Sequence, residues 1–449
     1  MKIHFIGIGG IGMSALAKYY LYNGHTISGS DLDYPSAFSK NEFENIKFFK
    51  GHKKSNLEKG IDLVIYTSAI KEDNPELVRA KNLGIRTLSY SEALGQLTKN
   101  YFTIAVAGMH GKSTTTAMIA NILIKAGFDP TVIIGSKVRG FGLNGEPSNF
   151  RLGKSKFLVI EADEYRAGFL NHYPDIVLIT NIEEEHLDYF KNFNNILKTF
   201  QKFIKRLKIK KNLESGFKRY LVLNKDDAGL KKLITKGLPK GIRIKFYSLR
   251  KKPKNLKLSI PGLHNLSNAL GALEVAKIFH IKQKLALGVL KEFTGIWRRL
   301  EFKGRLNGAM IFDDYGHHPT EIKATCQAAR ELIKNGRLFL IFQPHQYYRV
   351  LTLFDKFLNA FDLADFLILT DIYSVPGRES EEIKKKIGSK ILFDELSKIR
   401  KNVYYIKHFA DIEHFLKNNL KKGDICVIMG AGNIWQLTEK LLKDSLNKR

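Results

Sequence analysis

The chain has 449 residues, of which 44% are hydrophobic and 26% are charged, a length that predicts about three domains and excludes a small single-module binder. No apolar run reaches the roughly 20 residues of a membrane span, and the two cysteines, Cys326 and Cys426, are too few for a disulfide framework or a thiolate metal site. We therefore expect a cytoplasmic protein that does not insert into a membrane.

The formal net charge is +29, which raises nucleic acid, an acidic membrane or a polyanionic substrate as possible partners. The basic residues are spread along the whole chain, without the aromatic-interleaved basic stripe that is typical of nucleic-acid surfaces. We expect solvated basic faces, a modest attraction for phosphorylated small molecules and no nucleic-acid partner.

Apolar strand-like runs alternate with helical patterns along the chain, which predicts an α/β protein with mainly parallel sheets. The expected strands are 2–6, 26–28, 63–67, 102–107, 131–134, 157–161, 176–181, 220–224, 309–313, 338–342, 366–369 and 425–429. Glycine-bearing turns follow three of these strands, at Gly7, Gly108 and Gly430. Since each turn opens or closes its own α/β group, we expect boundaries near Asn100 and Thr294, and domains 1–99, 100–293 and 294–449.

The first glycine turn contains Gly7, Gly9 and Gly12 in a G-x-G-x-x-G pattern between an expected strand and an expected helix. Glycines let the backbone approach a diphosphate, and the helix N-terminus stabilises its charge. Asp31 ends the second expected strand, where a carboxylate can accept hydrogen bonds from a ribose or a base. The pattern does not distinguish a nicotinamide dinucleotide from a nucleotide-diphosphate sugar, so a dehydrogenase stays open here.

The second glycine turn carries Gly111, Lys112 and Ser113 between a strand and a helix. In such loops backbone amides surround phosphates, the lysine contacts β and γ oxygens, and the hydroxyl binds Mg²⁺. The strict phosphate-loop spacing requires a glycine at 106, where this chain has Val106, while Gly108 follows two residues later. We interpret the segment as a shortened ATP-binding loop.

A magnesium site needs hard oxygen ligands beyond one hydroxyl. Glu161 and His186 follow two expected strands, and parallel strands present their carboxyl ends at one edge of a sheet. Each residue alone has a structural explanation, as a helix cap or a hydrogen-bonded histidine. Together with Lys112 and Ser113 they predict one site for ATP and its metal ion.

Seven blocks of the sequence together resemble the Mur ligases of peptidoglycan synthesis. They are HFIGIGGIGMS, AGMHGKSTTT, EADE followed by NIEEEHLD, PGLHNLSNALGAL, WRRLE, DDYGHHPTE and QPHQYYR. The resemblance covers nearly the whole chain. It implies a Rossmann-like N-terminal domain that binds a UDP-sugar, a central P-loop ATPase domain with a mainly parallel sheet, and a Rossmann-like C-terminal domain that closes over the site and binds an amino acid.

The implied reaction joins L-alanine to the lactyl carboxylate of UDP-N-acetylmuramate at the expense of ATP, through an acyl phosphate. The resemblance also implies roles for residues at matching positions. The catalytic residues would be Lys112, Glu161, His186, Arg299 and Asp314, with Ser113, Glu161 and His186 on Mg²⁺. ATP would contact Gly108, His110, Gly111, Lys112, Ser113, Thr114, His264, Asn265, Asn268 and Arg299. The UDP-sugar would contact Gly9, Gly10, Ser14, Asp31 and Ser68, and the amino acid His345 and Arg349.

The chain departs from the family pattern at the amino-acid block. It has Gln346 and Tyr348 where the family usually has Arg and Ser, which leaves glycine, serine or a peptide open as the acceptor. His317 and His318 either belong to this pocket or cap and pack the next helix. Three alternative functions remain: a related tripeptide-recycling ligase, an NAD-dependent dehydrogenase and a basic nucleic-acid-binding ATPase. For the oligomeric state, we expect a monomer or a weak homodimer.

Overall fold

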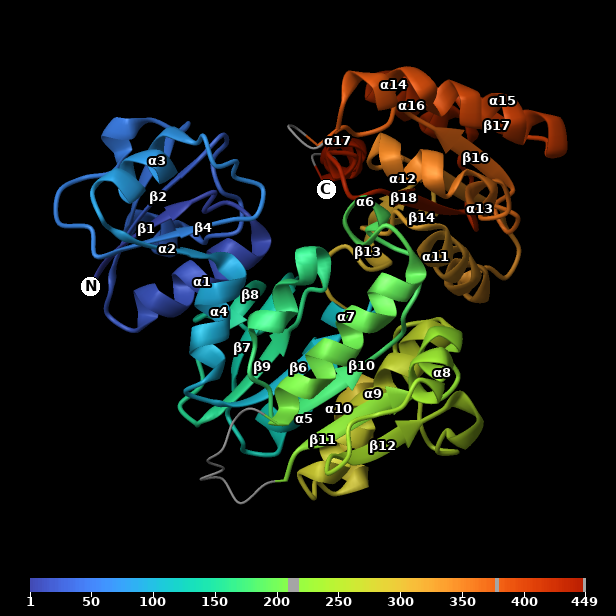
Figure 1. The fold of residues 1–449 in the computed structure, drawn as a ribbon. Helices are drawn as coiled ribbons and strands as arrows, with labels where there is room; N and C mark the ends of the chain where they lie inside the picture. The colour runs from blue at the N-terminus through green and yellow to red at the C-terminus, as the bar shows by residue number, and fades with distance from the viewer. Residues whose placement is uncertain (209–217, 376–378, 447–449) are drawn as a thin grey trace. The chain divides into compact units, whose positions relative to one another are not determined.

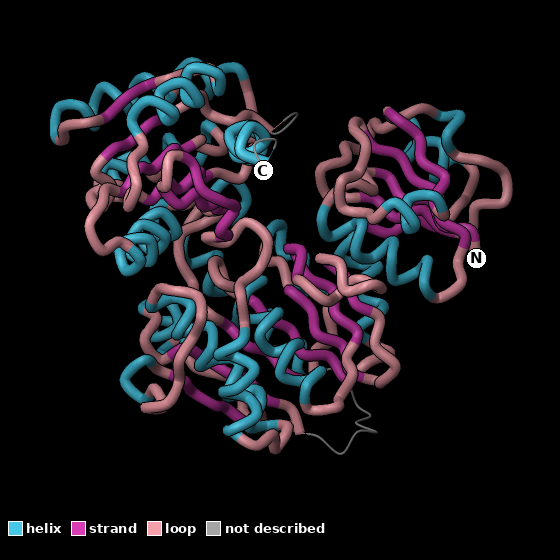
Figure 2. Tube along the Cα trace, turned by 180° about the vertical axis from the view of Figure 1, so that it is seen from behind, coloured by secondary structure: helices cyan, strands magenta, loops and turns pink. Residues whose placement is uncertain are grey.

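The computed structural model describes residues 1–208, 218–375 and 379–446 and contains three sheets, each with helices around it (Figures 1 and 2). Residues 1–185, 189–258 and 267–296 form one compact unit, and residues 186–188, 259–266 and 297–449 form a second. The predicted three-domain α/β fold with mainly parallel sheets is confirmed. Its boundaries near Asn100 and Thr294 stay predictions. No described helix is long and apolar enough to cross a membrane.

The first sheet has five parallel strands in the order β3-β2-β1-β4-β5. Its elements are β1 (Lys2–Ile6), α1 (Ile11–Tyr22), β2 (Thr26–Asp31), α2 (Lys40–Glu44), β3 (Ile46–Lys50), a short 3-10 turn (Lys54–Asn56), β4 (Leu63–Tyr66), α3 (Pro75–Asn82), β5 (Arg86–Ser89) and α4 (Tyr90–Thr98). The strand order reverses between β1 and β4, and ligands of such sheets bind outside the carboxyl ends of the strands at this reversal. The Gly7 turn lies there.

A buried carboxylate ties α3 to this sheet. Glu76 is fully buried, and it accepts hydrogen bonds from Ser30 Oγ and Asn56 Nδ2, both at 2.6 Å. Its Oε2 also lies 3.2 Å from His4 Nε2. Burial alone would raise the pKa of Glu76, but its hydrogen bonds with His4, His52 and Ser30 outweigh burial and hold that pKa below its usual range.

Glu76→Gln should lower the free energy of unfolding by about 1–3 kcal/mol at neutral pH, because it leaves buried donors without a charged acceptor. The folded-state pKa of Glu76 lies below its usual value of 4.5. Its contribution to stability is therefore complete above that value and is lost as the pH falls. Chemical denaturation at neutral pH and at about pH 3 measures this, and a difference between wild type and variant that is equal at both pH values would contradict the account.

The second sheet has the order β12-β11-β10-β6-β9-β7-β8 and is parallel except for the β7–β8 pair. The elements from residue 102 onwards are β6 (Phe102–Ala107), α5 (Lys112–Lys125), β7 (Thr131–Val138), β8 (Ser148–Arg151), β9 (Phe157–Glu161), a 3-10 segment (Tyr165–Asn171), β10 (Ile176–Ile179), α6 (Leu187–Phe190), α7 (Phe193–Lys205), β11 (Tyr220–Asn224), α8 (Ala228–Thr235), β12 (Arg243–Tyr247), α9 (Leu263–Ile278) and α10 (Gln283–Glu292). Two further 3-10 turns are Arg206–Lys208 and Leu249–Lys251. All six residues of the central strand β6 are buried, because helices cover both faces of a parallel sheet.

The third sheet has the order β13-β14-β18-β15-β16-β17, with only β13 antiparallel. Its elements are β13 (Glu301–Leu306), β14 (Ala309–Asp314), α11 (Pro319–Leu332), β15 (Leu338–Phe342), α12 (Tyr347–Thr352), α13 (Phe354–Leu358), β16 (Phe366–Leu369), α14 (Glu381–Lys386), α15 (Ser389–Ile399), β17 (Val403–Tyr405), α16 (Phe409–Asn419), β18 (Ile425–Met429) and α17 (Trp435–Leu446). In β15, Leu338, Leu340 and Phe342 enter one buried cluster while Phe339 and Ile341 enter another. The sheet therefore has a core on each face.

All twelve strands predicted from the sequence are present. The structure adds β3, β5, β8, β12, β13 and β17, which the sequence did not predict. These six are the outer strands of the three sheets.

Candidate active site

The turn that the sequence predicts to bind phosphate, here called the phosphate turn, follows the central strand β6. Gly108 and Gly111 have φ angles of +130° and +79°, a region that side-chain-bearing residues rarely adopt. A Cβ atom at Gly111 would lie 2.5 Å from Asn268 Oδ1, so the close approach of this side chain also requires glycine. Helix α5 begins at Lys112 without a side-chain cap. Its first amides can therefore face an anion.

The end of β10 holds this turn in place. Asn181 Oδ1 accepts hydrogen bonds from the N–H groups of Met109 at 3.1 Å and His110 at 2.9 Å, and Asn181 Nδ2 donates to the His110 carbonyl at 2.9 Å. Thr180 Oγ1 donates to the same carbonyl at 2.7 Å. No role for Thr180 and Asn181 was predicted from the sequence. Two polar residues directly after a buried strand do, however, indicate a functional position.

Lys112 lies with its ammonium among oxygen atoms of the same unit. Its Nζ donates to the carbonyl oxygen of Gly108 at 2.7 Å and to Glu164 Oε2 at 2.8 Å. Burial lowers the pKa of Lys112, but the carboxylates of Glu164, Asp163 and Glu161 outweigh burial and raise it. The side chain is therefore a permanent cation beside the turn.

Ser113 and Glu161 meet as the sequence predicts. Ser113 Oγ donates to Glu161 Oε2 at 2.8 Å, and the N–H of Gly135 donates to the same oxygen at 2.9 Å. A hydroxyl and a carboxylate are hard oxygen donors of the kind that Mg²⁺ prefers. The donor set therefore fits a magnesium ion beside the phosphate turn.

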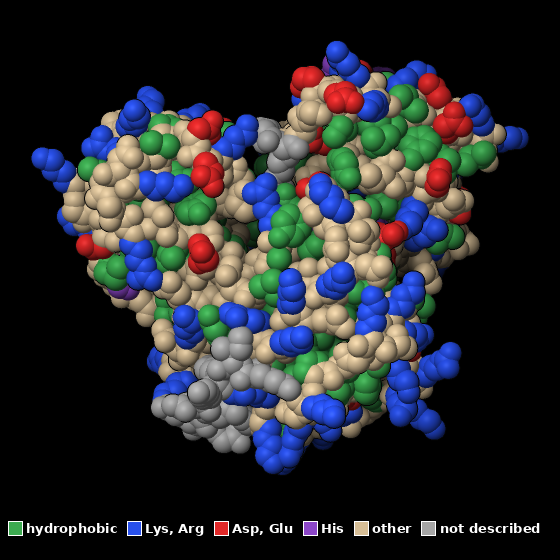
Figure 3. Space-filling model, viewed as in Figure 1, with side chains coloured by type: hydrophobic (Ala, Val, Ile, Leu, Met, Phe, Trp, Pro, Cys, Tyr) green, Lys and Arg blue, Asp and Glu red, His purple; other side chains and the backbone are tan. Residues whose placement is uncertain are grey.

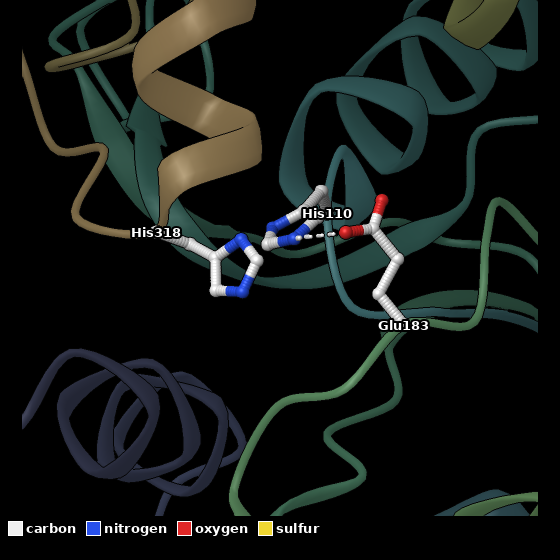
Figure 4. A group of neighbouring side chains, drawn as sticks. All are labelled: His110, Glu183 and His318. Atoms are coloured by element: carbon white, nitrogen blue, oxygen red, sulfur yellow. Dashed lines mark ion pairs between the residues drawn. The ribbon is translucent and has the colours of Figure 1, made fainter. Parts of the chain in front are cut away.

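Three further ATP candidates belong to the same unit. The ring of His110 lies beside Glu183 (Figure 4), with Nε2 3.9 Å from Oε2. Thr114 is buried in the first turn of α5. Asn268 is buried next to Gly111, and its Nδ2 has no hydrogen-bond partner within the described parts of the chain. A buried amide donor at this place can bind a nucleotide oxygen.

The glycine turn of the first sheet is held by the residue predicted to contact the ligand. Gly9 N–H donates to Asp31 Oδ2 at 2.8 Å, and Gly7 has a φ of +83°. Gly10 is the N-cap residue of α1, and no side chain caps this helix. The first N–H groups of α1 can therefore bind an anion. Asp31 thus shapes the turn, and any contact with a ribose or a base stays a prediction.

Two more UDP-sugar candidates connect the first sheet to the second. Ser14 is fully buried, and its Oγ accepts a hydrogen bond from Asn149 Nδ2 at 2.9 Å. The carbonyl oxygen of Ser68 accepts one from Arg166 Nη1 at 2.9 Å. Both contacts join elements of the first sheet to the segments around β8 and β9 of the second sheet.

Comparisons with known proteins agree with this architecture. Residues 2–102 match the family model "Mur ligase family, catalytic domain", residues 106–257 match "Mur ligase middle domain", and residues 298–432 match "Mur ligase, glutamate ligase domain". The UDP-N-acetylmuramate–L-alanine ligase of Caldanaerobacter subterraneus subsp. tengcongensis is 40% identical over 99% of this chain and 98% of its own length. The ligase of the same name from a Sulfurihydrogenibium species is 38% identical over 98% and 97%.

The chain belongs to the Mur ligase family. Among solved structures, it is similar to UDP-N-acetylmuramate-alanine ligase from Thermotoga maritima, with a TM-score of 0.81 and 26% identity over 100% of both chains. It is also similar to a murein peptide ligase from Psychrobacter arcticus, with a TM-score of 0.71 and 25% identity over 98% of both chains.

The other predicted ATP and catalytic residues of this Mur ligase belong to the second unit. Arg299 Nη1 donates to Glu321 Oε1 at 2.9 Å. Burial, with the positive charge of Arg299, lowers the pKa of His264 to about 4. Burial raises the pKa of Asp314 to about 6 against the opposing charge of Arg299. Asn265 Nδ2 donates to the Pro261 carbonyl at 2.7 Å.

His186 has a φ of +54° and belongs to the second unit, whereas Ser113 and Glu161 belong to the first. The approach of His186 and Arg299 to the phosphate turn therefore remains a prediction.

The residues predicted to bind the amino acid, His345 and Arg349, lie close together shortly after β15. Arg349 is buried, and its Nη1 donates to the His345 carbonyl at 2.8 Å. The His345 ring stacks on Tyr373, with 5.7 Å between ring centres. His318, labelled in Figure 4, accepts a hydrogen bond from Thr320 N–H and caps α11. The capping interpretation of His318 is thereby confirmed.

Gly111→Ala should weaken ATP binding by about tenfold or more and destabilise the fold by about 1–2 kcal/mol, since it combines a left-handed backbone with a clash at Asn268. Gly127→Ala is the matched control. Gly127 has a φ of +85°, but a Cβ atom there would meet nothing within 4 Å. Calorimetric titration with ATP separates the two, and equal losses of affinity would contradict the assignment of this turn.

Proposed function

We propose that this Mur ligase joins L-alanine to the lactyl carboxylate of UDP-N-acetylmuramate with hydrolysis of ATP to ADP and phosphate. The observation that carries the proposal is the convergence of Lys112, Ser113 and Glu161 at the uncapped N-terminus of α5. Relatives that bear the name of this activity cover the whole chain, which supports the choice among amide ligases.

A carboxylate is a poor acyl donor, so the lactyl carboxylate oxygen first attacks the γ-phosphorus of ATP, and the bond to ADP breaks. The transferring group spreads negative charge over its oxygens. Lys112 and the first amides of α5 supply positive charge for it. The neutral amine of alanine then attacks the acyl carbon, phosphate leaves with one former carboxylate oxygen, and the amine nitrogen loses one proton, which the departing phosphate can accept.

Ser113, Glu161 and His186 would hold Mg²⁺, which supplies charge neutralisation at the phosphate oxygens. The oxygens of Ser113 and Glu161, which hydrogen-bond to each other in this structure, would both be available to hold the ion. The Gly135 N–H keeps the carboxylate oriented.

The carboxylate of the amino acid would pair with Arg349, whose planar guanidinium suits two parallel hydrogen bonds. His345 and Tyr373 would form a wall of this pocket. Gln346 adopts a φ of +68° at the start of α12, so the residue that replaces the family's arginine also begins the helix that carries Arg349.

The alternatives explain less of the chain. A tripeptide-recycling ligase is the second candidate, because the murein peptide ligase of Psychrobacter arcticus covers the chain with a TM-score of 0.71, against 0.81 for the alanine ligase. A dehydrogenase function would account only for the first sheet of the chain. On the face shown in Figure 3, the Lys and Arg side chains of the described residues are scattered and form no continuous basic patch on that face, so this view gives no support to a nucleic-acid-binding ATPase.

We expect release of ADP and phosphate only when ATP, Mg²⁺, UDP-N-acetylmuramate and a small amino acid are all present. A coupled assay with L-alanine, glycine, L-serine and the recycled tripeptide side by side measures this, and L-alanine should give the highest kcat/KM. The tripeptide as preferred acceptor would favour the recycling ligase. ATP hydrolysis stimulated by DNA or RNA, or reduction of added NAD, would contradict the proposal.

Lys112→Ala should reduce turnover by about 1,000-fold or more, because the transferring phosphoryl group loses its lysine. UDP-N-acetylmuramate should still bind with an affinity within about threefold of wild type, since its proposed site lies on the first sheet. Calorimetric titration with the UDP-sugar provides the second readout. Loss of both together would contradict the separation of the two sites.

A further inference from the structure

Lys112 uses its three donors in two different ways. Its Nζ donates to the backbone carbonyl oxygens of Gly108 at 2.7 Å and Met109 at 3.3 Å. It also pairs with both oxygens of Glu164, at 2.8 and 3.0 Å. An ammonium has three N–H donors, so a phosphate oxygen can reach Lys112 only in exchange for one of these partners.

The cost of that exchange differs between the partners. The Glu164 side chain is 1% exposed, and breaking the ion pair of a buried carboxylate with its cation is strongly destabilising. A backbone carbonyl that loses one hydrogen bond loses a neutral interaction, which costs less. Phosphate is therefore expected to replace the carbonyls of Gly108 and Met109, while Glu164 keeps the lysine.

The fold places two carboxylates for two separate tasks after β9. Glu161, the last residue of the strand, accepts hydrogen bonds from Ser113 Oγ and the Gly135 N–H. Glu164 lies three residues later, in a turn closed by a hydrogen bond of 2.8 Å from Ala167 N–H to the Glu164 carbonyl oxygen. The main chain at Glu164 is therefore constrained by a hydrogen bond that does not involve the proposed metal ligands.

We propose that Glu164 is a positioning residue that orients the Lys112 ammonium toward the transferring phosphoryl group and stays paired with it when the carbonyls of Gly108 and Met109 are exchanged for phosphate oxygens. This inference rests on the proposed function as an ATP-dependent ligase. It separates Glu164, which acts through Lys112, from Glu161, which belongs to the proposed metal site.

Glu164→Gln keeps the shape of the side chain and removes its charge. It should lower kcat by about 30-fold, because a lysine without its counter-ion is misplaced in the transition state. ATP affinity measured by calorimetry in EDTA should stay equal or become tighter, since the variant removes a negative charge near the triphosphate. Glu164→Asp keeps the charge and should recover about fivefold or more of the lost kcat.

The matched control is Glu42→Gln. Glu42 forms another buried ion pair of the same unit, with its Oε2 3.0 Å from Lys18 Nζ, so the variant makes the same chemical change away from the phosphate turn. It should destabilise the protein while kcat and ATP affinity stay within about twofold of wild type.

Three results of the kinetic and binding measurements would each overturn the proposal: a kcat for Glu164→Gln within about twofold of wild type, a loss of ATP affinity in parallel with kcat, or no recovery with Glu164→Asp. A crystal structure with a non-hydrolysable ATP analogue tests it without turnover. Lys112 should remain paired with Glu164 and leave the two carbonyls, and a Lys112 that leaves Glu164 would refute the proposal. Absence of ligase activity in the wild type would instead refute the proposed function, and this structural test would still stand.

Discussion

The parallel pairing of β6 with β10 on one side and β9 on the other is the constraint on which the candidate site depends. It brings three strand ends to one edge of the second sheet. β6 supplies the glycine turn, β10 supplies Asn181 to hold that turn, and β9 supplies Glu161 and the Glu164 turn. A change of register in any of the three strands would separate these groups, because their side chains reach only a few ångströms.

The same edge is linked to the first sheet. Arg166 follows Glu164 by two residues and donates to the carbonyl of Ser68, in the loop proposed to hold the UDP-sugar. Arg166 and Ala167 both have left-handed backbone angles, with φ of 49° and 57°, a conformation that surrounding contacts must enforce. The turn that carries Glu164, the partner of Lys112, is thus continuous with the turn that contacts the Ser68 loop.

The sequence predicted the inner strands and missed the outer ones for a physical reason. An inner strand such as β15 is buried on both faces and is therefore apolar throughout. An outer strand such as β12, with the sequence RIKFY, has most of its side chains exposed, so it lacks the apolar run that marks a strand. Basic residues on such edges also prevent pairing with other chains, which makes the pattern still less strand-like.

The candidate site shows the same division. The phosphate turn was predictable because its residues, Gly111, Lys112 and Ser113, are adjacent in the sequence. Glu161 was predictable because it ends a strand that the sequence predicts. The roles of Asn181 and Glu164 were not, because each depends on a hydrogen bond across more than 50 residues, at separations of 71 and 52. The contact of Asp31 with Gly9 was not predictable either, because it depends on the pairing of β1 with β2 in the folded sheet.

The central claim is that this site uses ATP to activate a carboxylate on the UDP-sugar. Transfer of ¹⁸O from a labelled lactyl carboxylate measures that step most directly. Activation through an acyl phosphate predicts that one labelled oxygen leaves in the inorganic phosphate and the other stays in the amide carbonyl. Phosphate that carries no label while the amide forms would contradict the account.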